Sequence, residues 1–172
     1  LGIDGRDEFE RFLPLTYLES FGDFKPPVYA YLDVIPIKVW GLTEFAVRFP
    51  SALFGVLTVL ITYFLVKRLF HPRGVPQAQH HLGGVETLAL MSSFFLAISP
   101  WHINLSRAAF EANVATFFIV AGVWLFLVGM QSKRWILILS VASFVLSMYT
   151  FNTARIVSPL LALMLAIGFR RQ

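Results

Sequence analysis

Residues 51–66 read SALFGVLTVLITYFLV, and Lys67 and Arg68 follow them directly. The run contains no charged residue, so hydrocarbon solvates it better than water does. A helix that crosses a bilayer needs about 20 mostly apolar residues. We therefore predict a spanning helix here, extended by a few flanking residues.

Four more apolar segments follow, separated by short polar loops. The chain of 172 residues is 57% hydrophobic, above the roughly 45–50% of an ordinary soluble domain. We predict an all-α fold, a polytopic transmembrane helical bundle over residues 51–172. Pro159 shortens the regular part of the last segment. The five predicted spans cover about residues 51–69, 85–101, 114–130, 135–151 and 154–169.

The charges predict an orientation for these spans. Loops 67–86 and 131–134 and the C-terminal end carry seven Lys or Arg residues and a single acid, Glu86. Short loops rich in Lys and Arg stay in the cytoplasm. Residues 1–50, 102–113 and 152–155 are then expected at the outer face. This distribution explains the formal charge of +4 and argues against a nucleic-acid partner.

Residues 1–50 form the first outer loop in this topology, and they contain five of the nine prolines. Pro26-Pro27 can open a helix and Gly41 can end it. The Tyr and Trp side chains between them suit the level of the lipid headgroups. We predict one or two amphipathic helices lying along the membrane interface. The alternative is a surface helix of a folded outer domain.

No ionisable side chain lies at membrane depth inside the apolar runs, which argues against an ion or solute pathway through this part of the chain. The absence of cysteine excludes a disulfide framework and thiolate metal sites. His102 is interpreted as an interfacial ring beside Trp101. We predict no metal site, although three histidines lie in the 67–86 loop, at positions His71, His80 and His81.

Several blocks resemble bacterial membrane glycosyltransferases of the protein-mannosyltransferase and aminoarabinose-transferase type, which have the class C glycosyltransferase fold. The pair KPP and RFPSALFG, at this separation, is the most specific part of the resemblance. The blocks are DEFERFLPL (7–15), SFGDFKPPVYAYL (20–32), GLTEFAVRFPSALFGVLTVLITYFLVKRLF (41–70), AISPWHINLSRAAFEAN (97–113) and YTFNTAR (149–155).

The resemblance implies an enzyme that moves a sugar from a polyprenyl-phosphate donor to a protein, lipid or glycan at the outer face of a membrane. A bacterial inner membrane is the expected location. A carboxylate would act as the base, and basic residues would hold the leaving phosphate. Use of a divalent metal ion stays open. The alternatives are a non-catalytic homologue and a transporter-like membrane subunit.

The resemblance assigns the donor phosphate to Arg48 and Lys25. Arg48 could instead anchor the helix to lipid headgroups, and Lys25 could be solvated. The acidic motif of the family lies upstream of the block that residues 7–15 match. We therefore read the chain as an N-terminal fragment that lacks the catalytic carboxylate. Asp7 and Glu8 are weak substitutes, because a charged pair near a chain end is more often a surface feature.

Five more polar residues are expected to line the site at the outer face. Arg107 and Glu111 are four residues apart, so on one helix they would share a face and pair. Arg155 follows Asn152 in a loop too short to leave the neighbouring outer loops. The full set of lining residues is His102, Arg107, Glu111, Asn152 and Arg155.

Overall fold

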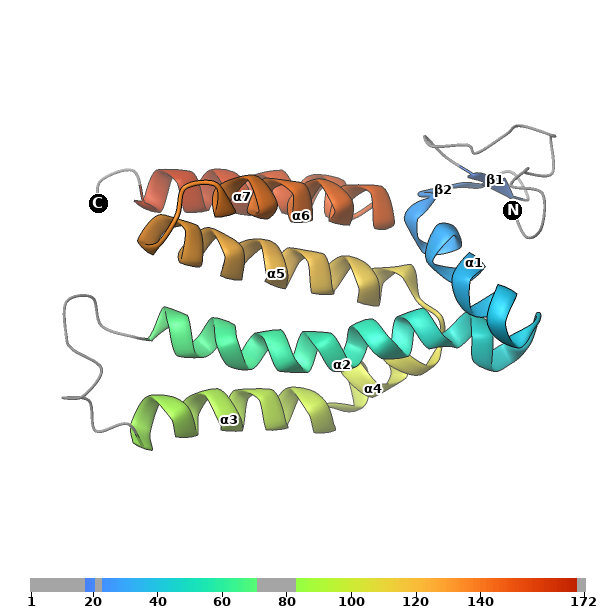
Figure 1. Cartoon of the computed structure of the whole chain (residues 1–172), viewed down its shortest axis with the longest axis horizontal. Helices are drawn as coiled ribbons and strands as arrows, with labels where there is room; N and C mark the ends of the chain where they lie inside the picture. The colour runs from blue at the N-terminus through green and yellow to red at the C-terminus, as the bar shows by residue number, and fades with distance from the viewer. Residues whose placement is uncertain (1–17, 21–22, 71–82, 170–172) are drawn as a thin grey trace.

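The computed structural model describes residues 18–20, 23–70 and 83–169. Over these residues the chain forms seven helices and a short two-stranded antiparallel ladder. Most of the helices run along one axis, while the helices over residues 28–40 and 100–107 are inclined to it (Figure 1). The elements are β1 (Leu18–Ser20), β2 (Asp23–Lys25), α1 (Val28–Trp40), α2 (Glu44–Leu69), α3 (Gly83–Ile98), α4 (Pro100–Arg107), α5 (Glu111–Gln131), α6 (Ile136–Thr150) and α7 (Ala154–Phe169).

The predicted fold class, an all-α membrane bundle, is confirmed. The ladder of β1 and β2 was not predicted, and it places Leu18 opposite Lys25 immediately before the two prolines. Helix α1 begins directly after these prolines. It ends at Gly41, whose φ of 72° is a conformation that glycine adopts without strain. The local signals for this helix were therefore read correctly.

Helix α5 lies in the middle of the bundle, between α2 and α6. Helix α3 packs on the other side of α2, and α7 packs on α6. Rings fill the α2–α5 contact: the centroid of Phe54 lies 5.0 Å from that of Phe117 and 5.5 Å from that of Phe118. Such tilted aromatic pairs stabilise a contact beyond the area they bury.

Small and hydroxyl-bearing residues let α5, α6 and α7 approach closely. A Cβ atom added at Gly122 would meet the ring of Phe144 at 3.1 Å. Ser140 Oγ donates to the carbonyl oxygen of Gly122 at 2.7 Å, and the hydroxyls of Ser147 and Ser158 lie 2.5 Å apart. Close approach at small residues with interhelical hydrogen bonds is typical of helix packing in membranes.

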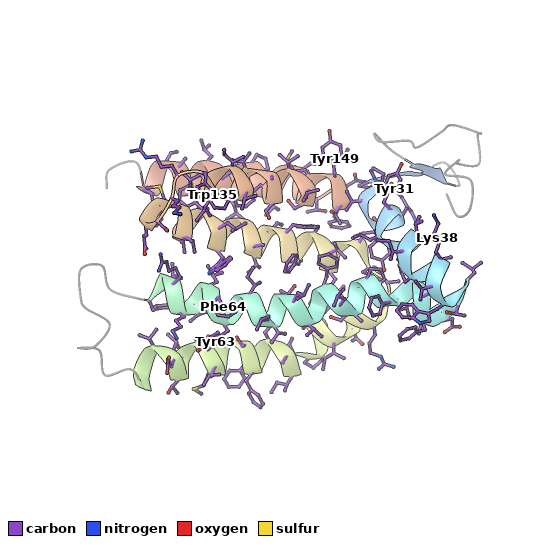
Figure 2. All side chains as sticks on the ribbon, in the orientation of Figure 1. Tyr31, Lys38, Tyr63, Phe64, Trp135 and Tyr149 are labelled. Carbon is purple, nitrogen blue, oxygen red and sulfur yellow. The ribbon has the colours of Figure 1, made fainter. Side chains whose placement is uncertain are left out.

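Large apolar side chains, by contrast, cover the outside of the bundle. Leu90, Phe94 and Ile138 are each at least 60% exposed. Figure 2 shows Trp135 toward one end of the bundle and Tyr149 and Tyr31 toward the other. An apolar girdle with Trp and Tyr toward its two ends fits a bilayer.

Within the described residues, α2 and α5 are each long and apolar enough to cross a membrane. Helices α3 and α4 reach that length only as a pair, which is bent by 57°. Helices α6 and α7 have 15 and 16 residues, or about 23 Å each, less than the roughly 30 Å of hydrocarbon in a bilayer. Five crossings therefore stay a prediction.

The bend between α3 and α4 follows from Ser99-Pro100. A residue before proline is driven out of the helical region, and Ser99 accordingly has an extended conformation with ψ 121°. Pro100 then occupies the first position of α4, where the missing N–H is not needed. Helix α7 covers the whole predicted range, Ala154–Phe169, with Pro159 inside it, so the predicted shortening by this proline is not observed.

Candidate functional site

Of the segments predicted at the outer face, the parts that the structure describes gather at one end of the bundle, beside α1 (Figure 1). We call this the α1 end and define it as residues 25–50, 100–113 and 150–155. The opposite end, which we call the loop end, consists of residues 67–70, 83–86 and 131–135. Because the helices alternate in direction, polar residues far apart in sequence are brought together at the α1 end.

A buried amide holds the centre of the α1 end together. Asn113, at the start of α5, is 1% exposed. Its Nδ2 donates to the carbonyl oxygen of Ser51 at 2.7 Å and to Ser106 Oγ at 3.3 Å. Ser51 Oγ in turn donates to the carbonyl oxygen of Leu105 at 3.0 Å. These bonds fix α4 against α2 and α5.

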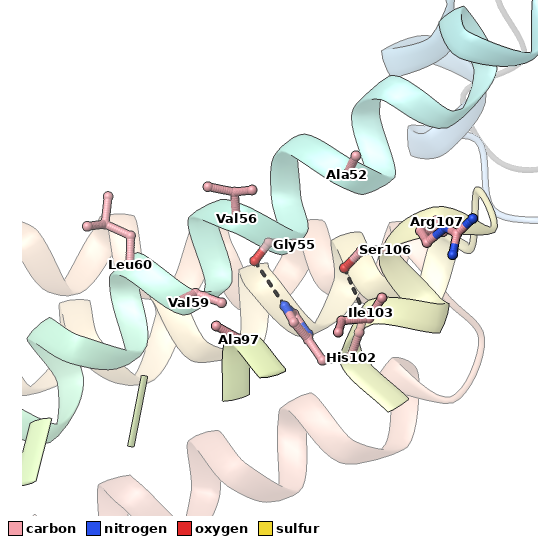
Figure 3. A pocket seen from close by; sticks show the side chains of 10 residues that line it. All are labelled: Ala52, Gly55, Val56, Val59, Leu60, Ala97, His102, Ile103, Ser106 and Arg107. Atoms are coloured by element: carbon pink, nitrogen blue, oxygen red, sulfur yellow. Dashed lines mark hydrogen bonds between the residues drawn. The ribbon is translucent and has the colours of Figure 1, made fainter. Parts of the chain in front are cut away.

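Gly55 permits the close approach of α4 to α2. A Cβ atom at this position would collide with the side chain of Ser106. His102 Nε2 forms a hydrogen bond of 3.2 Å with the carbonyl oxygen of Gly55 (Figure 3). His102 therefore joins α4 to α2 by a hydrogen bond within the candidate site. The sequence had indicated only an interfacial position for its ring.

A cluster of acidic and phenolic groups lies between α1 and α5. Tyr29 is 6% exposed and donates from its hydroxyl to the carbonyl oxygen of Val47 at 3.0 Å. Burial raises the pKa of Tyr29, and the negative charges of Asp33 and Glu111 raise it further. Burial also raises the pKa of Asp33 from 3.8 to about 7, with Glu111 contributing. The cluster therefore holds a carboxyl that gains or loses a proton near neutral pH.

Asp33 is the functional candidate that the sequence analysis missed. Its Oδ1 is buried and has no hydrogen-bond partner among the residues that the structure describes. A buried polar atom of this kind is uncommon and often marks a functional site. The signal in the sequence was the single acidic residue in the apolar and aromatic stretch VYAYLDVIPIKVW. A carboxylate in such surroundings is costly to bury.

The two residues assigned to the donor phosphate are both exposed at the α1 end. Arg48 forms an ion pair of 3.4 Å with Glu44 one turn earlier in α2. Their side chains are 55% and 85% exposed, so the pair is weak and an anionic ligand can replace Glu44. Lys25 ends β2 and precedes the two prolines. Phosphate binding by Arg48 and Lys25 stays a prediction.

The expectation for Arg107 and Glu111 needs a correction. Arg107 ends α4 and Glu111 begins α5, and Ala109 between them has a φ of 53°. This left-handed residue turns the chain, so the two side chains do not share a face of one helix. Arg107 instead lies beside α2 (Figure 3), and Glu111 lies near Asp33.

The α6–α7 connection contributes two exposed polar residues to the same end. The backbone N–H of Arg155 donates to the carbonyl oxygen of Asn152 at 3.1 Å, which forms the first turn of α7. Both side chains are exposed. The remaining sequence candidates lie outside the described residues, namely Asp7, Glu8, His71, His80 and His81.

The described residues were also tested for a metal site. In this part of the chain no group of three His, Asp or Glu side chains is close enough to hold a metal ion. Asp33 and Glu111 supply two carboxyls near each other, which is fewer ligands than a protein metal site normally has.

Residues 24–172 match the protein family described as dolichyl-phosphate-mannose-protein mannosyltransferase. The chain belongs to this family. The match includes α1, all of the bundle and every site residue named above except Asp7 and Glu8.

The chain is also similar to three curated proteins. The chain is 28% identical over 129 residues, 75% of its length, to a Bacillus subtilis (strain 168) protein named "Putative mannosyltransferase YkcB". It is also 30% identical over 114 residues and 25% identical over 147 residues to two uncharacterized proteins of Aquifex aeolicus (strain VF5), which cover 66% and 78% of the chain. The chain spans 16%, 20% and 32% of these three relatives. No solved structure matches the chain.

Proposed function

We propose that the protein transfers a glycosyl group, with mannose as the first candidate, from a polyprenyl-phosphate donor to an acceptor hydroxyl at the outer face of a bacterial inner membrane. The bond between the sugar C1 and the phosphate oxygen breaks, and its electron pair leaves with the phosphate. A bond forms between C1 and the acceptor oxygen. The acceptor proton passes to a carboxylate of the full-length protein.

One observation carries this proposal. Cationic side chains from four separate elements lie at the same end of the bundle as the carboxyls of Asp33 and Glu111. A departing phosphate needs positive charge where its negative charge develops, and arginine can bind it with two hydrogen bonds. Membership of a mannosyltransferase family supports the type of reaction. The cations are Lys25, Arg48, Arg107 and Arg155.

The test measures sugar transfer by the full-length protein in proteoliposomes that contain polyprenyl-phosphate mannose. We expect Arg48→Ala to lower kcat/KM by about 10- to 100-fold, the range for losing one hydrogen bond to a charged group. Lys133→Ala, which removes an exposed cation at the loop end, is the matched control and should retain full activity. Equal activity of both variants would remove Arg48 from the phosphate site.

The side of the membrane is tested separately. A cysteine introduced at the exposed residue Asn104, in a full-length protein whose cysteines outside residues 1–172 have been replaced, should react with an impermeant thiol reagent applied to intact cells. Reaction only after membrane disruption would place the α1 end in the cytoplasm. The non-catalytic alternative predicts intact insertion and outer labelling without transfer to any acceptor.

A further inference from the structure

A proline weakens the turn of α2 that carries Arg48. Pro50 lies inside the helix, two residues after Arg48. Because proline has no N–H, α2 lacks the hydrogen bond that residue 50 would otherwise donate to the carbonyl oxygen of Ala46. Ala46 and Pro50 are both buried, so bulk water does not replace that bond. The turn around Arg48 therefore depends on support from a neighbouring element.

The hydroxyl of Tyr29 in α1 provides such support. It donates to the carbonyl oxygen of Val47 at 3.0 Å. The backbone N–H of Ser51 acts on the same hydroxyl, where it opposes the rise that burial causes in the pKa of Tyr29. Val47 and Ser51 lie on either side of Pro50. Tyr29 is 6% exposed, and a hydrogen bond in such a water-poor place is stronger than one at the surface.

This hydrogen bond joins two segments that each carry a predicted phosphate-binding cation. Lys25 directly precedes Pro26-Pro27, and Tyr29 follows them as the second residue of α1. Because each proline fixes its φ, the chain between Lys25 and Tyr29 has little freedom. Arg48 directly follows the residue that accepts the bond. The hydroxyl thus connects KPP and RFPSALFG, the two blocks that form the most specific part of the resemblance.

The other contacts at the start of α2 do not fix the position of Arg48. The ring centroid of Trp40 lies 5.1 Å from that of Phe49 and 5.3 Å from that of Phe45, which packs the end of α1 on α2. Apolar contact depends little on direction, whereas a hydrogen bond weakens steeply when it is bent. The ion pair of Arg48 with Glu44 lies within one helix and moves with it.

We propose that Tyr29 is a positioning residue, whose hydroxyl steadies the turn that Pro50 weakens and so holds Arg48 in the orientation that the reaction needs. Tyr29 acts through Arg48. The inference rests on the proposed function for the role of Arg48. It adds a residue that the sequence analysis did not single out, and it gives the short helix α1 a task in the site.

The first experiment measures sugar transfer by the full-length protein in proteoliposomes that contain polyprenyl-phosphate mannose. Tyr29→Phe keeps the buried ring and should lower kcat/KM by about fivefold, the effect of losing one neutral hydrogen bond. In the double variant with Arg48→Ala, the same change should lower kcat/KM further by less than about twofold, because its effect passes through the missing side chain. Tyr149→Phe removes a hydroxyl from a side chain that is 47% exposed and should retain full activity.

The second experiment needs no activity. Hydrogen exchange of the same variants in nanodiscs, followed by mass spectrometry, reports how often the backbone of α2 opens. We expect Tyr29→Phe to raise the exchange rate in residues 44–49 by about threefold or more, and to leave α5 unchanged. Tyr149→Phe should leave both segments unchanged.

The two measurements separate this inference from the proposed function. Faster exchange in residues 44–49 supports the support of this turn by Tyr29 even if no variant transfers sugar, in which case the proposed function fails by itself. Equal losses of kcat/KM with and without the Arg48 side chain overturn the inference, because Tyr29 then acts independently of Arg48. Unchanged exchange in residues 44–49 also overturns it, and so does a rise spread over the whole bundle, which would indicate a general loss of stability.

Discussion

The two ends of the bundle differ in where their charged groups lie. At the loop end, Lys67 and Glu86 join α2 to α3 through an ion pair of 2.8 Å, with side chains 36% and 44% exposed. At the α1 end, Asp33 is half-buried, one of its oxygens has no partner among the described residues, and the charge of a second carboxylate, Glu111, adds to the effect of burial on its pKa. Both ends hold an ion pair of unlike charges, Lys67–Glu86 and Arg48–Glu44, and the α1 end in addition holds a half-buried carboxyl influenced by a like charge.

This difference indicates where function lies. An exposed pair of opposite charges contributes little to stability and is common on any protein surface. Like charges in a half-buried place lower stability, and such arrangements concentrate at functional sites, where a ligand or a reaction uses them. The comparison therefore favours the α1 end as the site and assigns the loop end a structural role.

The largest effect on stability is expected at Asn113. Asn113→Ala leaves the carbonyl oxygen of Ser51 and the hydroxyl of Ser106 without their buried donor. A loss of this kind costs about 1–3 kcal/mol, and with two partners affected we expect about 3 kcal/mol. The melting temperature of the purified protein in detergent measures it.

Thr116→Ala on the same helix is the control for that change. Thr116 is exposed, and its hydroxyl bonds only to the carbonyl oxygen of Ala112 in its own helix. Its loss should change the melting temperature little. If Asn113→Ala and Thr116→Ala behave alike, the α1 end is not held together by the buried amide, and the contrast between the two ends is weaker than the structure indicates.

Asp33→Asn should stabilise the protein, and more so at high pH. The pKa of Asp33 rises from 3.8 to about 7 on folding, so the folded state binds the proton more tightly. Stability is then highest below pH 3.8 and is lost as the pH rises toward 7. The shift corresponds to about 4 kcal/mol, and solvent screening at a half-buried carboxyl leaves about 2 kcal/mol. Because asparagine carries no charge, the Asp33→Asn variant does not lose this stability as the pH rises.

Melting temperatures of Asp33→Asn and of the unaltered protein at pH 4.5 and pH 8 test the sign. We expect a gain for the variant at pH 8 that shrinks toward pH 4.5. Glu44→Gln, which neutralises an exposed carboxylate of the same end, is the matched control and should show no such trend. A variant that is less stable at pH 8 would mean that the Asp33 charge is favourably paired in the folded protein.

The sequence predicted those parts of the fold that depend on local chemistry. Runs of uncharged residues marked the five long helices, and Pro26-Pro27 and Gly41 marked the bounds of α1, because proline and glycine restrict or permit particular backbone angles whatever surrounds them. The bend at Ser99-Pro100 has the same kind of cause. Its angle depends on how α4 packs against α2, and no local signal carries that information.

The candidate site was less predictable because burial is a property of the packed chain. Residues 102, 107, 111, 152 and 155 were found because they are polar and lie between apolar runs, and the structure brings their segments to one end. Asp33 was missed because an acid in an interfacial helix normally faces water. Arg107 and Glu111 do not lie on one helix because the chain turns at Ala109, whose positive φ is unusual for alanine and leaves no mark in the sequence.

The smallest effect is expected at the loop end, and it completes the comparison. Lys67→Met removes the ion pair with Glu86 and keeps the length of the side chain. Because both side chains stay partly exposed to water, at 36% and 44%, we expect little change in melting temperature and no change in sugar transfer. Glu86→Gln should behave in the same way, with or without 0.5 M salt. A salt-sensitive loss of stability in both variants would show that the loop end depends on its charges as much as the α1 end does, and the contrast that locates the site would no longer hold.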